Sequence, residues 1–165
     1  MEKEIKTIED IRSEVLDSVN HLTDEQLNEE LEADRWTIMQ VLDHLYLMER
    51  SLTKTIQLTL EKGEEQEVES KPVHFTVDRS TKVDAPPFVV PTEEELTLQE
   101  MKDKLASSRN DLLTFLDTTS KEALQRKAYP HPIFGHIRLD EWISFIGFHE
   151  KRHLEQIEEL KKKLF

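Results

Sequence analysis

The chain has 165 residues, a length that suits one domain spanning residues 1–165 around one hydrophobic core. Hydrophobic residues make up 36% and charged residues 35% of the chain, a balance typical of amphipathic helices with charged outer faces, and the three glycines disfavour an all-β fold. The formal net charge of −13 repels nucleic acid, and the absence of cysteine excludes disulfides, thiolate metal sites and cysteine nucleophiles.

The first half of the chain carries two long helical patterns, in which hydrophobic residues recur at three- and four-residue steps. The first pattern covers residues 5–22, and a capping box at Thr23 predicts a short helix directly after it. The second begins at Thr37, whose hydroxyl can cap the first turn, and it continues to about residue 60.

The second half predicts two more long helices after an interruption. Residues 63–91 contain four prolines and no sustained helical stripe, so they form a long loop that allows a crossover between helices two and three. A capping box at Thr97 opens the third helix, and Ser120 caps a short piece after it. Residues 129–138 contain two prolines and one glycine and are predicted to be a loop, and the fourth helix covers about 139–160. These patterns predict a helical bundle.

The sequence shows neither a secretory signal peptide nor a membrane-spanning segment. The N-terminal ten residues are charged and lack the apolar region of a secretory signal, and no stretch reaches the ~18 apolar residues of a membrane span. We therefore expect a cytoplasmic protein with no membrane partner.

Three histidines are the candidate metal ligands. His149 and His153 lie four residues apart, so they share one helix face, and both belong to a stripe of core-facing residues. His44 occupies an inward position of the second helix. Buried imidazoles need partners for their nitrogens, and one shared divalent ion would satisfy a nitrogen of each ring while leaving an open coordination position. The alternative is that all three are ordinary histidines with hydrogen-bonded rings.

The string from His149 to His153 matches the H-E-x-x-H motif of zinc metalloproteases. Such enzymes need a third ligand further along the chain, and only a short lysine-rich end follows this helix. The third ligand is therefore sought upstream, at His44, and a protease is disfavoured.

Several motifs along nearly the whole chain resemble the DinB/YfiT-like superfamily of metalloenzymes. They are Trp36-Thr37-Ile38, Asp43-His44-Leu45, Pro72, Ala85-Pro86-Pro87, Pro91, Thr97, His131-Pro132-Ile133-Phe134-Gly135, Glu141-Trp142-Ile143 and the run from His149 to Ile157. One departure is Arg138, which stands where relatives often carry a serine or threonine helix cap.

The resemblance implies an all-α fold, an up-down-down-up four-helix bundle with a long loop between helices two and three. It implies one divalent metal ion per chain, nickel or zinc, held by His44, His149 and His153. It also implies a homodimer, and it points to transfer of a low-molecular-weight thiol such as bacillithiol as a possible reaction.

Three functions follow from a metal ion with an open coordination position. The first, which we expect ahead of the other two, is a thiol S-transferase acting on small electrophiles, with the sulfur brought by the cosubstrate because the chain has no cysteine. The second is a hydrolase of a small-molecule substrate, and the third is a non-enzymatic metal- or ligand-binding bundle. Asp43 and Glu150 are candidates for a catalytic base, with solvent exposure as the ordinary alternative. His131 and His136 could flank the pocket mouth, and the favoured alternative is that they are turn residues beside Pro132 and Gly135.

Overall fold

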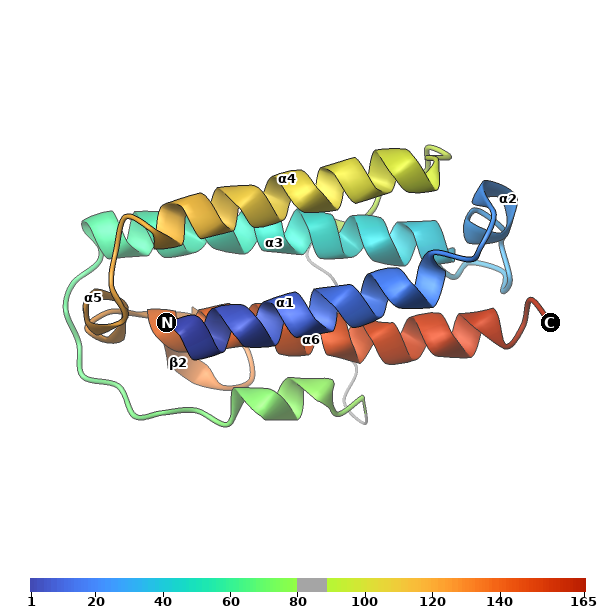
Figure 1. Ribbon diagram of the computed structural model, residues 1–165. Helices are drawn as coiled ribbons and strands as arrows, with labels where there is room; N and C mark the ends of the chain where they lie inside the picture. Colours follow the sequence, from blue (N-terminus) through green and yellow to red (C-terminus); the bar gives the residue numbers. More distant parts are fainter. Residues whose placement is uncertain (80–88) are drawn as a thin grey trace.

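A computed structural model describes residues 1–79 and 89–165 of the chain, and four long helices dominate it (Figure 1). The elements in chain order are α1 (Glu2–Val19), α2 (Asp24–Leu27), α3 (Ile38–Lys62), the 3-10 helix η1 (Val73–Val77), α4 (Leu98–Leu116), α5 (Lys121–Gln125), β1 (Ala128–His131), β2 (Gly135–Arg138) and α6 (Leu139–Lys161). The Ala85-Pro86-Pro87 motif lies outside the described residues.

The four long helices follow an up-down-down-up path, which confirms the expected fold class. In Figure 1, α1 and α6 run in one direction, and α3 and α4 run in the opposite direction. Helix α1 packs against α6, and α3 packs against both α4 and α6. Because α3 and α4 are parallel neighbours, the chain must return to the starting end between them, and the long segment after α3 makes that return.

Side-chain caps fix where most of these helices begin, as the sequence predicted. Thr23 and Thr37 each accept a hydrogen bond from the amide three residues on, and the side chain at that position bonds back to complete a capping box. Thr97 and Ser120 cap α4 and α5 in the same way with their hydroxyls alone. At α6, Arg138 makes no side-chain cap, and its guanidinium instead binds Asp140 of the first turn at 3.1 Å.

Helices α1 and α6 approach closely at Gly147 of α6. A Cβ atom at this position would lie 3.1 Å from Cγ2 of Ile8 and 3.2 Å from Cδ1 of Ile11. Both isoleucines belong to α1, so the absence of a side chain at Gly147 allows α1 and α6 to approach closely. The rest of the interior is aliphatic and aromatic, with residues such as Ile56 and Leu112 fully buried.

The prediction of a loop over residues 129–138 is wrong. Strands β1 and β2 pair antiparallel there, from Ala128 opposite Arg138 to His131 opposite Gly135. Gly135 supplies a positive φ of 70° after the turn, and Pro130 is tolerated because each strand of a two-stranded sheet is an edge. Strands of four residues are too short to show an alternating pattern of hydrophobic and polar residues. The prolines and the glycine in this stretch were therefore the stronger signal, and they indicated a loop.

None of the helices in the described ranges, 1–79 and 89–165, is long and apolar enough to cross a membrane.

Candidate metal centre

Packing of α3 against α6 brings the three predicted histidines together in the bundle interior. His44 lies in the second turn of α3, and His149 and His153 lie one turn apart in the middle of α6. One nitrogen from each ring lies within 4.8 Å of the other two. The two helices thus bring His44 into contact with His149, although the two residues lie 105 positions apart in the sequence.

The shortest contact in the cluster joins two ring nitrogens. His44 Nε2 lies 3.2 Å from His149 Nε2. The centroid of the His153 ring lies 4.8 Å from that of His44 and 4.6 Å from that of His149, in edge-on arrangements. The three rings therefore surround a common point instead of stacking on one another.

Two of the rings are oriented by a hydrogen bond at their outer nitrogen. His44 Nδ1 lies 2.8 Å from the carbonyl oxygen of Val89, so it carries the proton and donates it. His153 Nδ1 lies 2.8 Å from Oε1 of Gln156, one turn further along α6. A neutral imidazole that donates from Nδ1 has its lone pair on Nε2, and this lone pair is the one a metal ion uses.

The surroundings keep the imidazoles uncharged. His44 is 2% exposed and His149 is 7% exposed, whereas His153 is half-buried. Burial lowers the pKa of His44, and burial together with the rings of His153 and His44 holds the pKa of His149 well below its usual value. Burial, followed by the neighbouring His44, lowers the pKa of His153 to about 3. At neutral pH all three rings offer lone pairs.

The donor set fits a divalent cation of the zinc type. Zinc–nitrogen bonds of about 2.0–2.1 Å in tetrahedral geometry place two ligating nitrogens roughly 3.3 Å apart. The observed 3.2 Å between His44 Nε2 and His149 Nε2 agrees with this spacing. Three neutral imidazoles also match the ligand types that zinc and nickel accept, and a three-residue set leaves a coordination position open.

Aromatic side chains form the wall behind the histidines. The Trp36 ring lies 5.0 Å from His44, and Phe145 stacks on His149 at 5.9 Å with an interplanar angle of 25°. His131, at the end of β1, packs against Phe145 at 5.1 Å, so it lies one ring away from the cluster. His136 is exposed on β2.

The two carboxylates considered as catalytic bases are engaged with other partners. Asp43 binds Lys104 Nζ at 2.6 Å through Oδ1 and accepts the Thr92 amide at 3.0 Å through Oδ2. Both oxygens of Glu150 bind arginine side chains. The alternative that these carboxylates are solvent-exposed is wrong, because each is 2% exposed. Side chains at adjacent helix positions point about 100° apart. Asp43 and Glu150 therefore point away from the neighbouring histidines and bind other partners.

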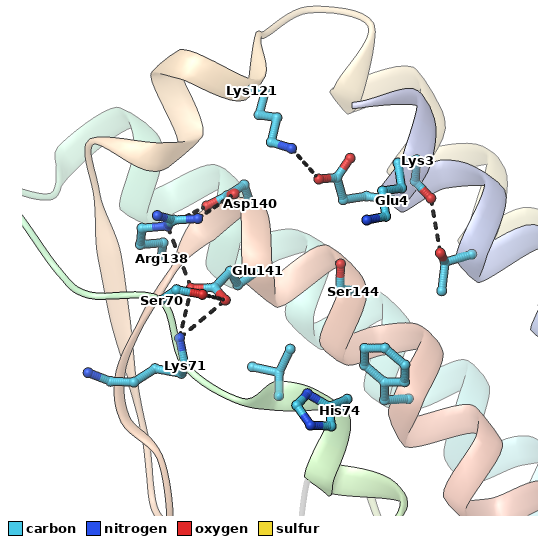
Figure 2. Close-up of a pocket in the computed structure, with 13 residues that line it drawn as sticks. Lys3, Glu4, Ser70, Lys71, His74, Lys121, Arg138, Asp140, Glu141 and Ser144 are labelled. Atoms are coloured by element: carbon cyan, nitrogen blue, oxygen red, sulfur yellow. Dashed lines mark hydrogen bonds and ion pairs between the residues drawn. The ribbon is translucent and has the colours of Figure 1, made fainter.

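A separate cavity of about 360 Å³ lies at the end of the bundle where α6 begins (Figure 2). Its described lining includes Lys3, Lys71, Glu141 and Ser144 and none of the three histidines. Most of its charges are paired internally: Lys121 binds Glu4 at 2.6 Å and Arg138 binds Asp140 at 3.1 Å. The cavity is therefore not the mouth of the histidine cluster.

Sequence reasoning missed three parts of this centre. The carbonyl of Val89 comes from the segment before α4, and only the tertiary fold places it at His44. Gln156 had a usable signal, since it lies three residues after His153 on the same helix face. Phe145, four residues before His149, follows the same spacing rule.

Comparison with known families decides the relationship of the chain. The family model described as the DinB superfamily matches residues 7–157. The chain belongs to the DinB superfamily. This DinB protein is 34% identical over 153 residues to YuaE of Bacillus subtilis (strain 168), a match that covers 93% of this chain and 94% of YuaE. It is 30% identical over 159 residues to the "Putative metal-dependent hydrolase OB0782" of Oceanobacillus iheyensis, with 96% of this chain and 84% of the relative covered.

Two solved structures share the fold of this DinB protein. TT2238, a four-helix bundle protein, superposes with a TM-score of 0.67 at 19% identity, covering 96% of this chain and 98% of its own. YfiT from Bacillus subtilis, described as "a probable metal-dependent hydrolase with an unusual four-helix bundle topology", superposes with a TM-score of 0.66 at 19% identity, covering 99% and 86%. At this identity the likeness establishes the fold.

Proposed function

We propose that this DinB protein is a metal-dependent hydrolase of a small-molecule substrate, with one divalent ion held by His44, His149 and His153. The observation that carries the proposal is the convergence of three imidazole nitrogens within 4.8 Å of one another in a largely buried site. The name of the relative from Oceanobacillus iheyensis and the description of YfiT support hydrolysis over the other reactions of such a site.

The protein's own residues would orient and desolvate the ion. Val89 and Gln156 hold the rings of His44 and His153 so that their Nε2 lone pairs face inward. Trp36 and Phe145 pack against His44 and His149 and shield these rings from water. When bound, a zinc-type ion supplies Lewis acidity and lowers the pKa of a water ligand towards neutrality. Asp43 and Glu150 take no part in proton transfer in this proposal, because the oxygens of Asp43 already bind Lys104 and the Thr92 amide and those of Glu150 bind two arginines.

Elemental analysis and a hydrolysis assay test this function together. The protein as purified, or after loading with zinc or nickel, should hold about one ion per chain and should hydrolyse members of a panel of small esters, amides and lactones. His44→Ala should lose the ion and the rate together. His136→Ala is the matched control, because His136 is an exposed histidine outside the cluster, and it should keep both. The proposal would be contradicted if the parent protein bound neither zinc nor nickel.

Thiol transfer is the competing reaction of the same site. The chain has no cysteine, so the sulfur would arrive with a cosubstrate such as bacillithiol. Incubating the metal-loaded protein with bacillithiol and a chloro-aromatic acceptor measures this reaction directly. A rate of thioether formation above that of every hydrolysis in the panel, lost in His44→Ala, would replace hydrolase by thiol S-transferase. Metal binding without either reaction would favour a non-enzymatic metal carrier.

A further inference from the structure

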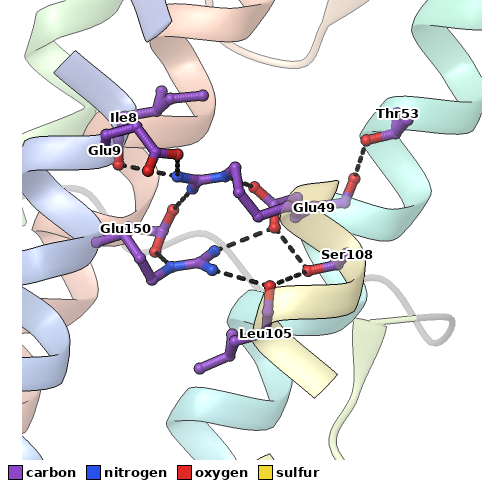
Figure 3. Close-up of polar contacts among 9 residues, drawn as sticks. Ile8, Glu9, Glu49, Thr53, Leu105, Ser108 and Glu150 are labelled. Carbon is purple, nitrogen blue, oxygen red and sulfur yellow. Dashed lines mark hydrogen bonds and ion pairs between the residues drawn. The ribbon is translucent and has the colours of Figure 1, made fainter. Parts of the chain in front are cut away.

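Each of the four long helices contributes one charged residue to a buried cluster in the middle of the bundle (Figure 3). These residues are Arg12 of α1, Glu49 of α3, Arg109 of α4 and Glu150 of α6. Their exposed fractions lie between 1% for Glu49 and 7% for Arg12. We call these four residues the Arg–Glu cluster.

The cluster is a closed ring of ion pairs. Arg12 binds Glu150 Oε1 at 2.7 Å and Glu49 Oε1 at 3.1 Å. Arg109 binds Glu49 Oε2 at 2.7 Å and Glu150 Oε2 at 2.9 Å. All four carboxylate oxygens of Glu49 and Glu150 therefore accept from a guanidinium, and two buried positive charges face two buried negative ones. Arg109 also binds the more exposed Glu9 of α1 at 2.8 Å.

The arginines also contact the backbone of the helices. Arg12 Nη1 donates to the carbonyl of Leu105 on α4 at 3.0 Å, and Arg109 Nη1 donates to the carbonyl of Ile8 on α1 at 3.1 Å. The guanidinium is a planar group with its donors in a fixed arrangement, so these contacts tolerate little sliding of one helix along another. Hydrophobic attraction between aliphatic side chains is non-directional and carries no such requirement on donor angle.

The two glutamates lie on the same helices as the three histidines. Glu150 follows His149 directly on α6, and Glu49 lies five residues after His44 on α3. Two carboxylates facing one another would repel, and Arg12 and Arg109 each bridge Glu49 of α3 to Glu150 of α6. Neither α1 nor α4 contributes one of the three histidines.

We propose that Arg12 and Arg109 position the metal-binding histidines by fixing the axial register of α3 against α6. Metal ligation needs nitrogen positions correct to a few tenths of an ångström, whereas helices that slip by one turn move by about 5.4 Å. The ring of ion pairs sets the level at which His44 meets His149 and His153. The inference rests on the proposed function for the metal ion, and it assigns both arginines as positioning residues.

Replacing the whole cluster by methionine separates positioning from stability. Apolar replacement of a complete buried ion-pair set by residues of similar volume often preserves folding, whereas removal of one member leaves an uncompensated charge. The fourfold variant R12M/E49M/R109M/E150M should keep its helical circular dichroism and a cooperative unfolding transition. Its zinc affinity, measured by competition with a chromophoric chelator, should fall at least tenfold. The visible spectrum of its cobalt-loaded form should differ from that of the parent.

Two single variants complete the comparison. Arg109→Lys keeps the charge and loses the two-pronged contact, so it should fold and should bind zinc with an affinity between those of the parent and the fourfold variant. Leu112→Ala is the control, because Leu112 is a fully buried residue of α4 outside the cluster. It should lower stability and leave both zinc affinity and the cobalt spectrum as in the parent.

A metal-independent distance tests the register itself. The chain has no cysteine, so cysteines introduced at the exposed positions Lys54 of α3 and Glu155 of α6 can carry the only two spin labels. The distribution of distances between the labels should shift or broaden in the fourfold variant and in Arg109→Lys, and it should stay unchanged in Leu112→Ala. A parent protein that binds no metal would overturn the proposed function, while the label distances would still decide the register. Unchanged distances in the two cluster variants, or unchanged zinc affinity with a metal-binding parent, would overturn the positioning role.

Discussion

The histidine cluster and the Arg–Glu cluster lie side by side on α6, yet they satisfy their polar groups in opposite ways. His149 belongs to the first and Glu150 to the second. In the Arg–Glu cluster every carboxylate oxygen faces a guanidinium donor. In the histidine cluster, ring nitrogens face one another, and the outer nitrogens of His44 and His153 are already engaged.

This difference separates a structural polar cluster from a site built for a ligand. A ring of matched donors and acceptors is complete without any further group, and burial then makes it rigid. Lone pairs of neutral imidazoles that face one another are satisfied only when a proton or a cation lies between them. The interior of this bundle therefore supplies one set of charges that holds the helices and one set of donors that a metal ion would use.

The largest expected effect comes from removing one residue of the Arg–Glu cluster. Arg109→Met leaves Glu49 and Glu150 short of positive charge in the core, so the free energy of unfolding should fall by about 3–5 kcal/mol. Urea denaturation followed by circular dichroism measures the loss. Asp10→Ala, which removes the exposed pair between Lys6 and Asp10, should cost less than about 0.5 kcal/mol. Similar losses in the two variants would refute the assignment of the cluster as the structural centre.

The next effect concerns the histidine cluster and its ion. Zinc at about 100 times its dissociation constant should raise the free energy of unfolding by about 2.7 kcal/mol, because only the folded state brings the three imidazoles together. Thermal unfolding with and without zinc measures this gain. His44→Ala should abolish it, and His136→Ala should retain it. A gain that survives in His44→Ala would place the ion elsewhere.

Acid should weaken the metal-free protein through the histidines. The folded-state pKa of His153 is about 3, below the value of about 6.5 expected in the unfolded chain, so the unfolded state binds more protons between these two pH values. Stability is then fully present above pH 6.5 and is lost as pH falls towards 3. At pH 5.5 His153 alone should account for a loss of about 1.4 kcal/mol.

His153→Ala tests the origin of this acid sensitivity. The variant should show a shallower decrease of the free energy of unfolding between pH 6.5 and 5 than the parent. Leu112→Ala should be less stable at every pH in this range but should keep the slope of the parent. Equal slopes in His153→Ala and the parent would show that another group causes the decrease.

The smallest expected effect concerns the orientation of one ligand. Gln156→Leu removes the hydrogen bond to His153 Nδ1, and loss of such an outer contact weakens metal binding by about tenfold. The stability of the metal-free chain should change by less than about 0.5 kcal/mol, since Gln156 is only half-buried. Chelator competition measures the affinity, with the exposed neighbour Glu155→Ala as the control. An unchanged affinity in Gln156→Leu would contradict the orienting role.

Local patterns were enough for the α-helices, whereas the 3-10 helix η1 lies in the segment predicted as a loop. Spacing of hydrophobic residues and the hydroxyl caps at Thr23, Thr37, Thr97 and Ser120 predicted the helix starts, because caps and periodicity depend on residues within one turn. The hairpin at residues 128–138 escaped prediction, since its short strands are stabilised by contacts such as that of Trp142 Nε1 with the Tyr129 carbonyl at 3.1 Å. The family motifs added the up-down-down-up path.

The sequence by itself determined four amphipathic helices, the inward faces on which His44, His149 and His153 lie, and the absence of any thiol. Tertiary structure decided that these three rings share one point, that the carbonyl of Val89 orients His44, and that Asp43 and Glu150 are buried in ion pairs. The physical reason is that helical periodicity sets the direction of a side chain around its own axis. The level at which two helices meet depends on contacts between distant segments, and in our proposal the Arg–Glu cluster supplies them between α3 and α6.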